Sequence, residues 1–415
     1  MIRPAGTARL AAVGATITAL LWLSPAAAGD QTMPGATVES VVAIAKRLNP
    51  AVAAASLDFD AAVHKIGTAG VLADPTLILE AWDVNRQGVG QRRIGFDQEV
   101  KLWGKYGLER NIAQSDAEAA KFQGRATVID LVAQVVAAHG EYNAAYEAVG
   151  ISVEIKRRYD EILGLLRSRY GTTSVDQQDV IRAEIEAATA EGDVVRRQGE
   201  QKSAAARLNA LIGRPSLAPL AAPTGFRAVR AISLAQAQAL ARSANPMLAL
   251  AGAQSNSAAQ TKSLTDLNYY PDVMLGAKYV QRPGTEDTGE FTLGVKLPLH
   301  YEVKDAEQRA AGARLGAAQA RNEALRLRID GQIADAWFGV DALRKVVQIY
   351  ATRQLPPARS SVDNAQNAFQ AGSSDLSSVF ESERRLRAVQ LDLLKLKVEL
   401  QTKYAEMERL AGGSL

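Results

Sequence analysis

The stretch YGTTSVDQQDVIRA at residues 170–183 has a counterpart in FQAGSSDLSSVFE at residues 369–381. An aromatic residue opens both stretches, Asp176 aligns with Asp375, and Val180 aligns with Val379. In each case a turn containing glycine and serine precedes an aspartate and then apolar residues at helical spacing. This order is typical of a turn that leads into a capped helix. The chain therefore contains the same turn and helix start twice.

The similarity between the two parts of the chain extends far beyond these turns. Asn49-Pro50 recurs as Asn245-Pro246, Pro75 recurs as Pro271, and both parts close on a leucine followed two residues later by glycine. So many matches at a steady spacing indicate an internal repeat. We expect a first repeat at residues 29–213, a linker rich in proline and alanine at 214–235, and a second repeat at 236–415.

Each repeat is expected to contain two strands before its long helices. In the second repeat, apolar residues alternate with polar or small ones at about 271–282 and 289–299, with a Pro-Gly turn between. The first repeat shows the same pattern at about 75–85 and 92–103, although Ile78 and Trp82 fall on the polar face. The predicted fold is mainly α with a small β part, built from a duplicated β-hairpin and long coiled-coil helices.

The helices are expected at about 104–212 and 303–412. Val379, Leu386, Leu393, Leu400 and Met407 recur at every seventh position, which predicts a coiled-coil seam. The proline-free run at 104–169 would form a helix about 100 Å long, a length that suits a tube across the periplasm. A break is expected where Pro356-Pro357 interrupts the second repeat.

Residues 1–28 have the layout of a secretory signal peptide. Arg3 and Arg9 precede an apolar run at 10–23, and three alanines at 26–28 supply a cleavage site. A single membrane anchor is the alternative, but the run of about 14 residues is shorter than the roughly 20 needed to span a bilayer. No later stretch is apolar enough for a membrane helix, so a chain that spans a bilayer would have to use strands.

Four strands per chain cannot close into a membrane barrel, since the smallest known barrels have eight. Two copies would supply eight strands and a filled interior, whereas three would supply twelve and leave room for a pore. A small soluble β-sandwich is the alternative arrangement for two amphipathic hairpins. The membrane interpretation therefore requires assembly of several chains.

The two turn stretches, together with the endings LNALIG at 208–213 and LAG at 410–412, resemble TolC-type outer-membrane efflux proteins, the outer membrane factor family. The stretch EVKLWGKYGLER at 99–110 resembles the heavy-metal (CzcC-like) branch of that family. This resemblance implies a homotrimer with a twelve-stranded β-barrel in the outer membrane, continued by a periplasmic α-barrel. It also implies a periplasmic adaptor protein and an inner-membrane pump as partners, and no cofactor.

The resemblance further points to candidate residues at the periplasmic tip, where acidic side chains in the family narrow the pore. The matching positions are Ser378 and Glu381 in the second repeat and Asp179 and Arg182 in the first, and these four are the pore-gate candidates. An ordinary helix start, where acidic residues are favoured, is the alternative for them. The turn and cap candidates are Gly171, Gly372, Asp176 and Asp375.

Composition excludes several function classes. The formal net charge of +3 gives no basic footprint for nucleic acid. The chain has no cysteine, and His64, His139 and His300 share no ligand spacing, so no metal site is expected. No catalytic constellation is evident either, and we expect no enzyme. Three functions remain open: an efflux channel for metal ions or drugs, the channel of a type I protein secretion system, and a non-transporting periplasmic coiled-coil scaffold.

Overall fold

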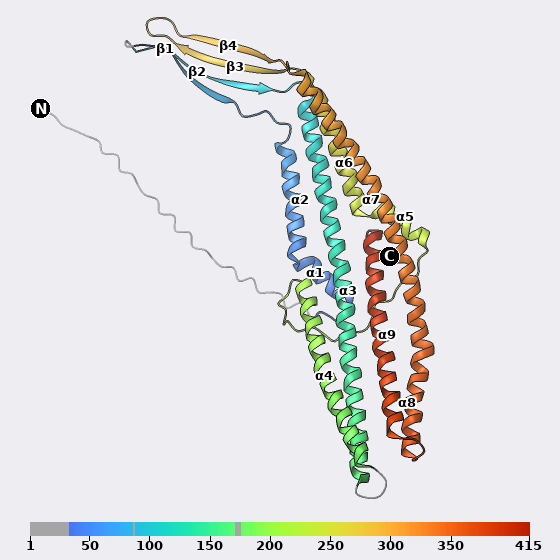
Figure 1. The fold of residues 1–415 in the computed structure, drawn as a ribbon. Coiled ribbons are helices and arrows are strands. Elements are labelled where there is room, and N and C mark those ends of the chain that lie inside the picture. Colours follow the sequence, from blue (N-terminus) through green and yellow to red (C-terminus); the bar gives the residue numbers. More distant parts are fainter. Residues whose placement is uncertain (1–32, 86–87, 171–175) are drawn as a thin grey trace, which may run out of the picture.

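A computed structural model describes residues 33–85, 88–170 and 176–415. The expected signal peptide, residues 1–28, and Gly171 lie outside these described residues. Over these residues the protein is mainly helical, with one small sheet and a duplicated order of elements (Figure 1). The first repeat contains α1 (Val38–Leu48), α2 (Pro50–Thr68), β1 (Thr76–Asn85), β2 (Gly88–Val100), α3 (Lys105–Tyr170) and α4 (Gln177–Leu211). The second contains α5 (Leu234–Ala244), α6 (Pro246–Asp266), η1 (Leu267–Tyr269), β3 (Asp272–Gln281), β4 (Thr288–Lys296), α7 (Tyr301–Ile349), η2 (Tyr350–Gln354), α8 (Leu355–Gln370) and α9 (Leu376–Ala411).

The repeated Asn-Pro pair has the same role in both repeats. Asn49 caps α2 by accepting a hydrogen bond from the Ala51 amide at 2.8 Å, and Asn245 caps α6 in the same way. Each asparagine also donates its side-chain amide to a carbonyl at the end of its own repeat, at 2.7 Å for Asn49 and 2.8 Å for Asn245. The acceptors are the carbonyl oxygens of Leu211 and Leu410. One residue type thus starts a helix and ties both ends of the repeat together.

Within the described parts of the chain, four strands form a single antiparallel sheet in the order β1-β2-β3-β4. The two hairpins join through β2 and β3, where Ile94 lies opposite Tyr279. Strand β2 runs from Gly88 to Val100, earlier than the expected 92–103. It ends early because Trp103 and Gly104 have φ angles of 63° and 77°, which turn the chain into α3.

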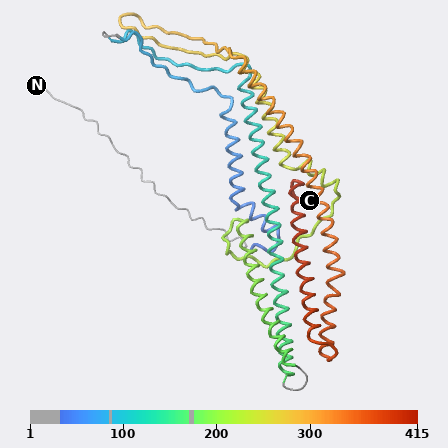
Figure 2. The backbone as a smooth tube through the Cα atoms, in the orientation of Figure 1, coloured from blue at the N-terminus to red at the C-terminus, as the bar shows by residue number. Residues whose placement is uncertain are grey.

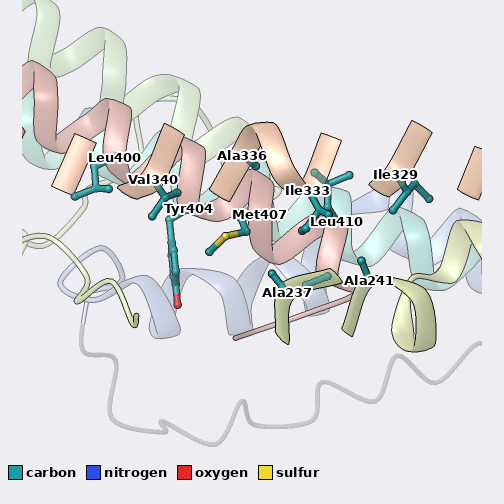
Figure 3. Packing of buried hydrophobic residues seen from close by; sticks show 11 residues of the cluster. Ala237, Ala241, Ile329, Ile333, Ala336, Val340, Leu400, Tyr404, Met407 and Leu410 are labelled. Carbon is teal, nitrogen blue, oxygen red and sulfur yellow. The ribbon is translucent and has the colours of Figure 1, made fainter. Parts of the chain in front are cut away.

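The helices extend from one end of the sheet as two long hairpins (Figures 1 and 2). One hairpin is α3 with α4, and the other is α7 and α8 with α9. Narrow apolar seams hold them together, and all five heptad residues of α9 are buried. Figure 3 shows one such seam, where Ile333 of α7 and Met407 of α9 pack over Ala237 of α5.

The expected break at Pro356-Pro357 takes a different form. The chain stays helical, but Tyr350–Gln354 widens into a π-helical turn directly before α8, whose first turn carries the two prolines. The Leu355 amide donates to the Tyr350 carbonyl, five residues back. Proline lacks an amide proton and its ring displaces the carbonyl four residues earlier. The wider turn accommodates both effects, so the helix continues where the sequence predicts an interruption.

Candidate functional site

The free ends of the two helical hairpins carry the sequence-predicted tip residues. Asp375 lies at the N-cap of α9, where its side chain accepts the Ser378 amide at 3.1 Å. Asp176 lies at the N-cap of α4 and accepts the Gln178 amide at 3.3 Å. Gly372 has a φ of 71° in the turn before α9, a left-handed conformation that glycine adopts without a steric cost. The local sequence therefore sets where both helices begin.

The four gate candidates have different surroundings. Arg182 of α4 donates to the Ser377 hydroxyl of α9 at 2.6 Å, so it joins the two hairpins. The Ser378 hydroxyl donates to the Asp375 carbonyl and belongs to the helix start. Glu381 is exposed and Asp179 is half-buried, and neither carboxylate has a hydrogen bond or ion pair within residues 33–85, 88–170 and 176–415. The structure therefore connects Arg182 to α9 and leaves both acidic candidates without a polar partner among the described residues.

A buried carboxylate close to the tip is absent from the sequence prediction. Glu383 of α9 is 1% exposed and accepts hydrogen bonds from Arg158 of α3 at 3.1 Å and from Gln366 of α8 at 3.0 Å. Burial raises the pKa of the Glu383 carboxyl, although the Arg158 guanidinium acts in the opposite direction. The Tyr159 ring also meets the Phe380 ring edge-on at 5.2 Å. One side chain thus links three helices from both hairpins.

A second set of contacts joins α4 to α9 farther from the tip. Arg387 forms an ion pair with Asp193 at 2.6 Å, and Arg384 lies 3.9 Å from Glu186. Separation of the hairpins would have to break these pairs as well as the Glu383 contacts. These contacts can keep the tip in one conformation. Because they include charged pairs, the stability of the contact between the hairpins should depend on pH and salt.

The sheet at the opposite end has two unlike faces. Glu80, Arg93, Lys278 and Glu290 lie on one face, and Lys278 pairs with Glu80 at 3.0 Å while Arg93 lies 3.7 Å from Glu290. The other face is apolar and stays open in the single chain, where Phe291 is 90% exposed. Its other exposed residues are Leu77, Leu79, Ile94, Phe96, Leu275, Tyr279, Leu293 and Val295. Large apolar side chains at such exposure indicate a surface that something other than water covers.

Helix α4 carries a second uncovered surface. Ile181, Ile185, Ala188, Gly192, Val195 and Gly199 follow at alternating steps of four and three residues, the spacing of a coiled-coil seam. All six are exposed, and Ile185 is 62% exposed. The opposite side of α4 is already packed on α3 through Ala183, Ala187 and Ala190. We call these six residues the outer seam of α4, and within the described residues no helix covers it.

Comparison with known proteins identifies the family. The model of the family described as "Outer membrane efflux protein" matches residues 41–214 and 237–413. The chain belongs to the outer membrane efflux protein family. It is an outer-membrane efflux channel subunit with a helical extension into the periplasm, and its family is one of channels rather than enzymes. No protein with a curated description matches the chain.

Solved structures of outer-membrane proteins share the fold. VceC of Vibrio cholerae matches with a TM-score of 0.76 at 19% identity, over 91% of this chain and 96% of that one. The CmeC channel of Campylobacter jejuni matches with a TM-score of 0.77 at 13% identity, over 91% and 85%. The open state of MtrE of Neisseria gonorrhoeae matches with a TM-score of 0.77 at 16% identity, over 91% of this chain and 89% of that one.

Membrane-spanning helices and metal sites are both lacking in the part of the chain that the structure describes. None of its helices combines the length and apolar character needed to cross a membrane. No group of three or more histidine, aspartate or glutamate side chains there is arranged to hold a metal ion.

Proposed function

We propose that three copies of the chain assemble into one channel, in which their sheets close into a twelve-stranded barrel. The observation that carries this proposal is the sheet itself. One face is apolar and exposed, the other is charged, and among the described residues β1 and β4 each pair on one side only. An open strand edge in lipid leaves backbone groups without partners, so the edges must meet other copies. The apolar face then meets lipid, and the charged face lines water.

The outer seam of α4 supports closure of the helical part. Small and branched apolar residues at coiled-coil spacing favour close packing of another helix. Helix α7 offers a matching surface, because Leu327, Phe338 and Ile349 lie exposed at steps of eleven residues, which is three helical turns. Contact between α4 of one copy and α7 of the next would continue the channel wall below the barrel.

We also propose that this channel works with a periplasmic adaptor and an inner-membrane pump, and itself performs no chemistry. In this scheme the tip is the docking end, and the pump supplies the energy. Glu381 and Asp179 would each form a ring of three carboxylates in the trimer. Such rings raise the local cation concentration and repel anions. Arg182 and Ser378 would line the same constriction, with Arg182 moderating the negative charge.

For the cargo, we propose metal ions, because the stretch at 99–110 resembles the heavy-metal efflux branch. Disruption of the gene followed by growth on a panel of metal salts and drugs tests this assignment. Increased sensitivity to metal salts alone supports it, and increased sensitivity to drugs alone contradicts it.

The assembly itself has a direct test in detergent extracts of outer membranes. We expect a heat-modifiable trimer there, with an N-terminus that begins after Ala28 once the signal peptide has been removed. The purified trimer should form ion-conducting pores in planar bilayers, and Glu381→Gln should reduce their preference for cations. A protein recovered only from the soluble periplasm, or a trimer without conductance, would contradict the proposal.

A further inference from the structure

Trp82 stands out on the charged face of the sheet. Its position is fixed by contacts with that face, because its indole nitrogen donates to Glu80 at 3.1 Å and the Arg93 guanidinium lies 4.7 Å from its ring centre. The ring is nevertheless 52% exposed. A large aromatic side chain on a water-facing surface forgoes the stabilisation that burial would give it. In the single chain, the exposed part of the ring is thus an apolar surface beside the charged groups of this face.

The surrounding charges hold the ring in one orientation. Arg93 is itself held by Gln91 at 3.1 Å and lies near Glu80 and Glu290, while Lys278 bonds Glu80 at 3.0 Å. These contacts involve all four strands. The indole is thus fixed on one face by a guanidinium and at its edge by a carboxylate. A ligand that stacks on the exposed part of the ring would not have to order it first, which favours binding.

We propose that Trp82 is a binding site for flat aromatic molecules on the inner wall of the channel. This inference rests on the proposed trimer, in which the charged face lines the lumen. Trp82 lies near the end of β1 that is farthest from the helices, so three rings would surround the lumen close to its outer opening (Figure 1). The Glu80 and Glu290 carboxylates beside each ring are both held in ion pairs, with Arg93, Lys278 and Arg282 as the cations. Because neither carboxylate is left unpaired to attract a cation, we expect selection to depend on a flat aromatic surface.

The test is current block in planar bilayers containing the purified full-length protein. Ethidium, a flat aromatic cation, is added to the side of the barrel and compared with tetraethylammonium, a cation of the same charge without an aromatic ring. We expect ethidium to block wild-type channels, and Trp82→Ala to weaken that block about three- to tenfold, the range of a single aromatic contact. Trp82→Phe should retain part of the effect, and tetraethylammonium should not distinguish the variants.

Ile78→Ala is the matched control, because Ile78 is an apolar residue of β1 on the same face as Trp82 and has no ring. Ethidium block that is unchanged in Trp82→Ala, or weakened equally by Ile78→Ala, would overturn the inference while leaving the channel intact. Wild-type protein that forms no conducting trimers would instead overturn the proposed function, and the inference with it.

Discussion

Glu383 shows how one residue can determine the stability of the tip. Glu383→Ala removes the buried acceptor of Arg158 and Gln366 and leaves Arg158 with Glu154 alone, so we expect a loss of about 2 kcal/mol in the free energy of unfolding. Glu383→Gln keeps an acceptor for Arg158 and Gln366 and should cost less than about 1 kcal/mol. Glu184→Gln is the control, because its ion pair with Arg167 is exposed and contributes little. Thermal unfolding of the purified protein measures all three, and equal losses for the alanine and glutamine variants would contradict the assignment.

The raised pKa of Glu383 also predicts how the difference in free energy of unfolding between the wild type and Glu383→Gln changes with pH. A carboxyl whose pKa in the folded protein lies above its ordinary value of 4.5 takes up a proton on folding. The wild type should therefore lose stability relative to Glu383→Gln as the pH rises from 4.5 through the raised pKa. Above that pKa the difference should stay constant. A wild type that gains stability over the variant in this range would show that Arg158 outweighs burial.

His139 of α3 should make stability change with pH in the opposite direction. It is 1% exposed in α3, and its Nε2 lies 2.9 Å from the Gly35 carbonyl, so that nitrogen carries the proton. Burial lowers the pKa of His139 below its ordinary value of 6.5. The stability that this group contributes should be lost as the pH falls from 6.5 through the lowered pKa. In thermal unfolding, His139→Gln should lose less stability than the wild type as the pH falls below 6.5. An equal loss in both proteins would show that His139 does not cause this pH dependence.

At the scale of single elements, the outer seam of α4 gives a prediction that separates assembly of the trimer from folding of each copy. Ile185 is exposed in the single chain, so Ile185→Glu should leave the fold of each copy intact. In the trimer the same change would bury a charge against a neighbouring helix, and we expect assembly to weaken at least tenfold. Gln198→Glu, an exposed position beside the seam, is the control. Light scattering in detergent measures the trimer fraction, and full assembly of Ile185→Glu would show that nothing packs on this seam.

The elements also show what can be predicted from sequence. The sevenfold spacing in α9 and the alternation in β3 and β4 report burial along one element, so both are readable locally. The π-helical turn before Pro356-Pro357 is not, because proline predicts a disturbed hydrogen bond without saying whether the helix breaks or widens. The outer seam of α4 is not evident from the sequence. Alanine and glycine occupy half of its positions, so its hydrophobic periodicity is weak.

At the scale of the whole molecule, partners distant in sequence limit prediction of the site. Glu383 looks like a solvated residue beside a coiled-coil seam, and its partner Arg158 lies 225 residues away in the other repeat. Gate candidates taken from a resemblance share this limit. Arg182 contacts α9, whereas the Glu381 and Asp179 carboxylates form no hydrogen bond or ion pair within the described residues. The duplication is nevertheless decisive for the architecture, because two hairpins per chain produce four strands with two open edges.

Closure of the three sheets through β1 and β4 is the central claim, and disulfide trapping tests it most directly. The chain has no cysteine, so introduced pairs such as Leu79→Cys with Phe291→Cys, scanned along both edge strands, report only on this contact. Within one chain β1 and β4 lie at opposite edges of the sheet, about 14 Å apart and beyond disulfide reach. Oxidation in outer membranes should give a covalent ladder that ends at the trimer. A ladder that ends at the dimer, continues past the trimer, or never forms for any pair would contradict the account.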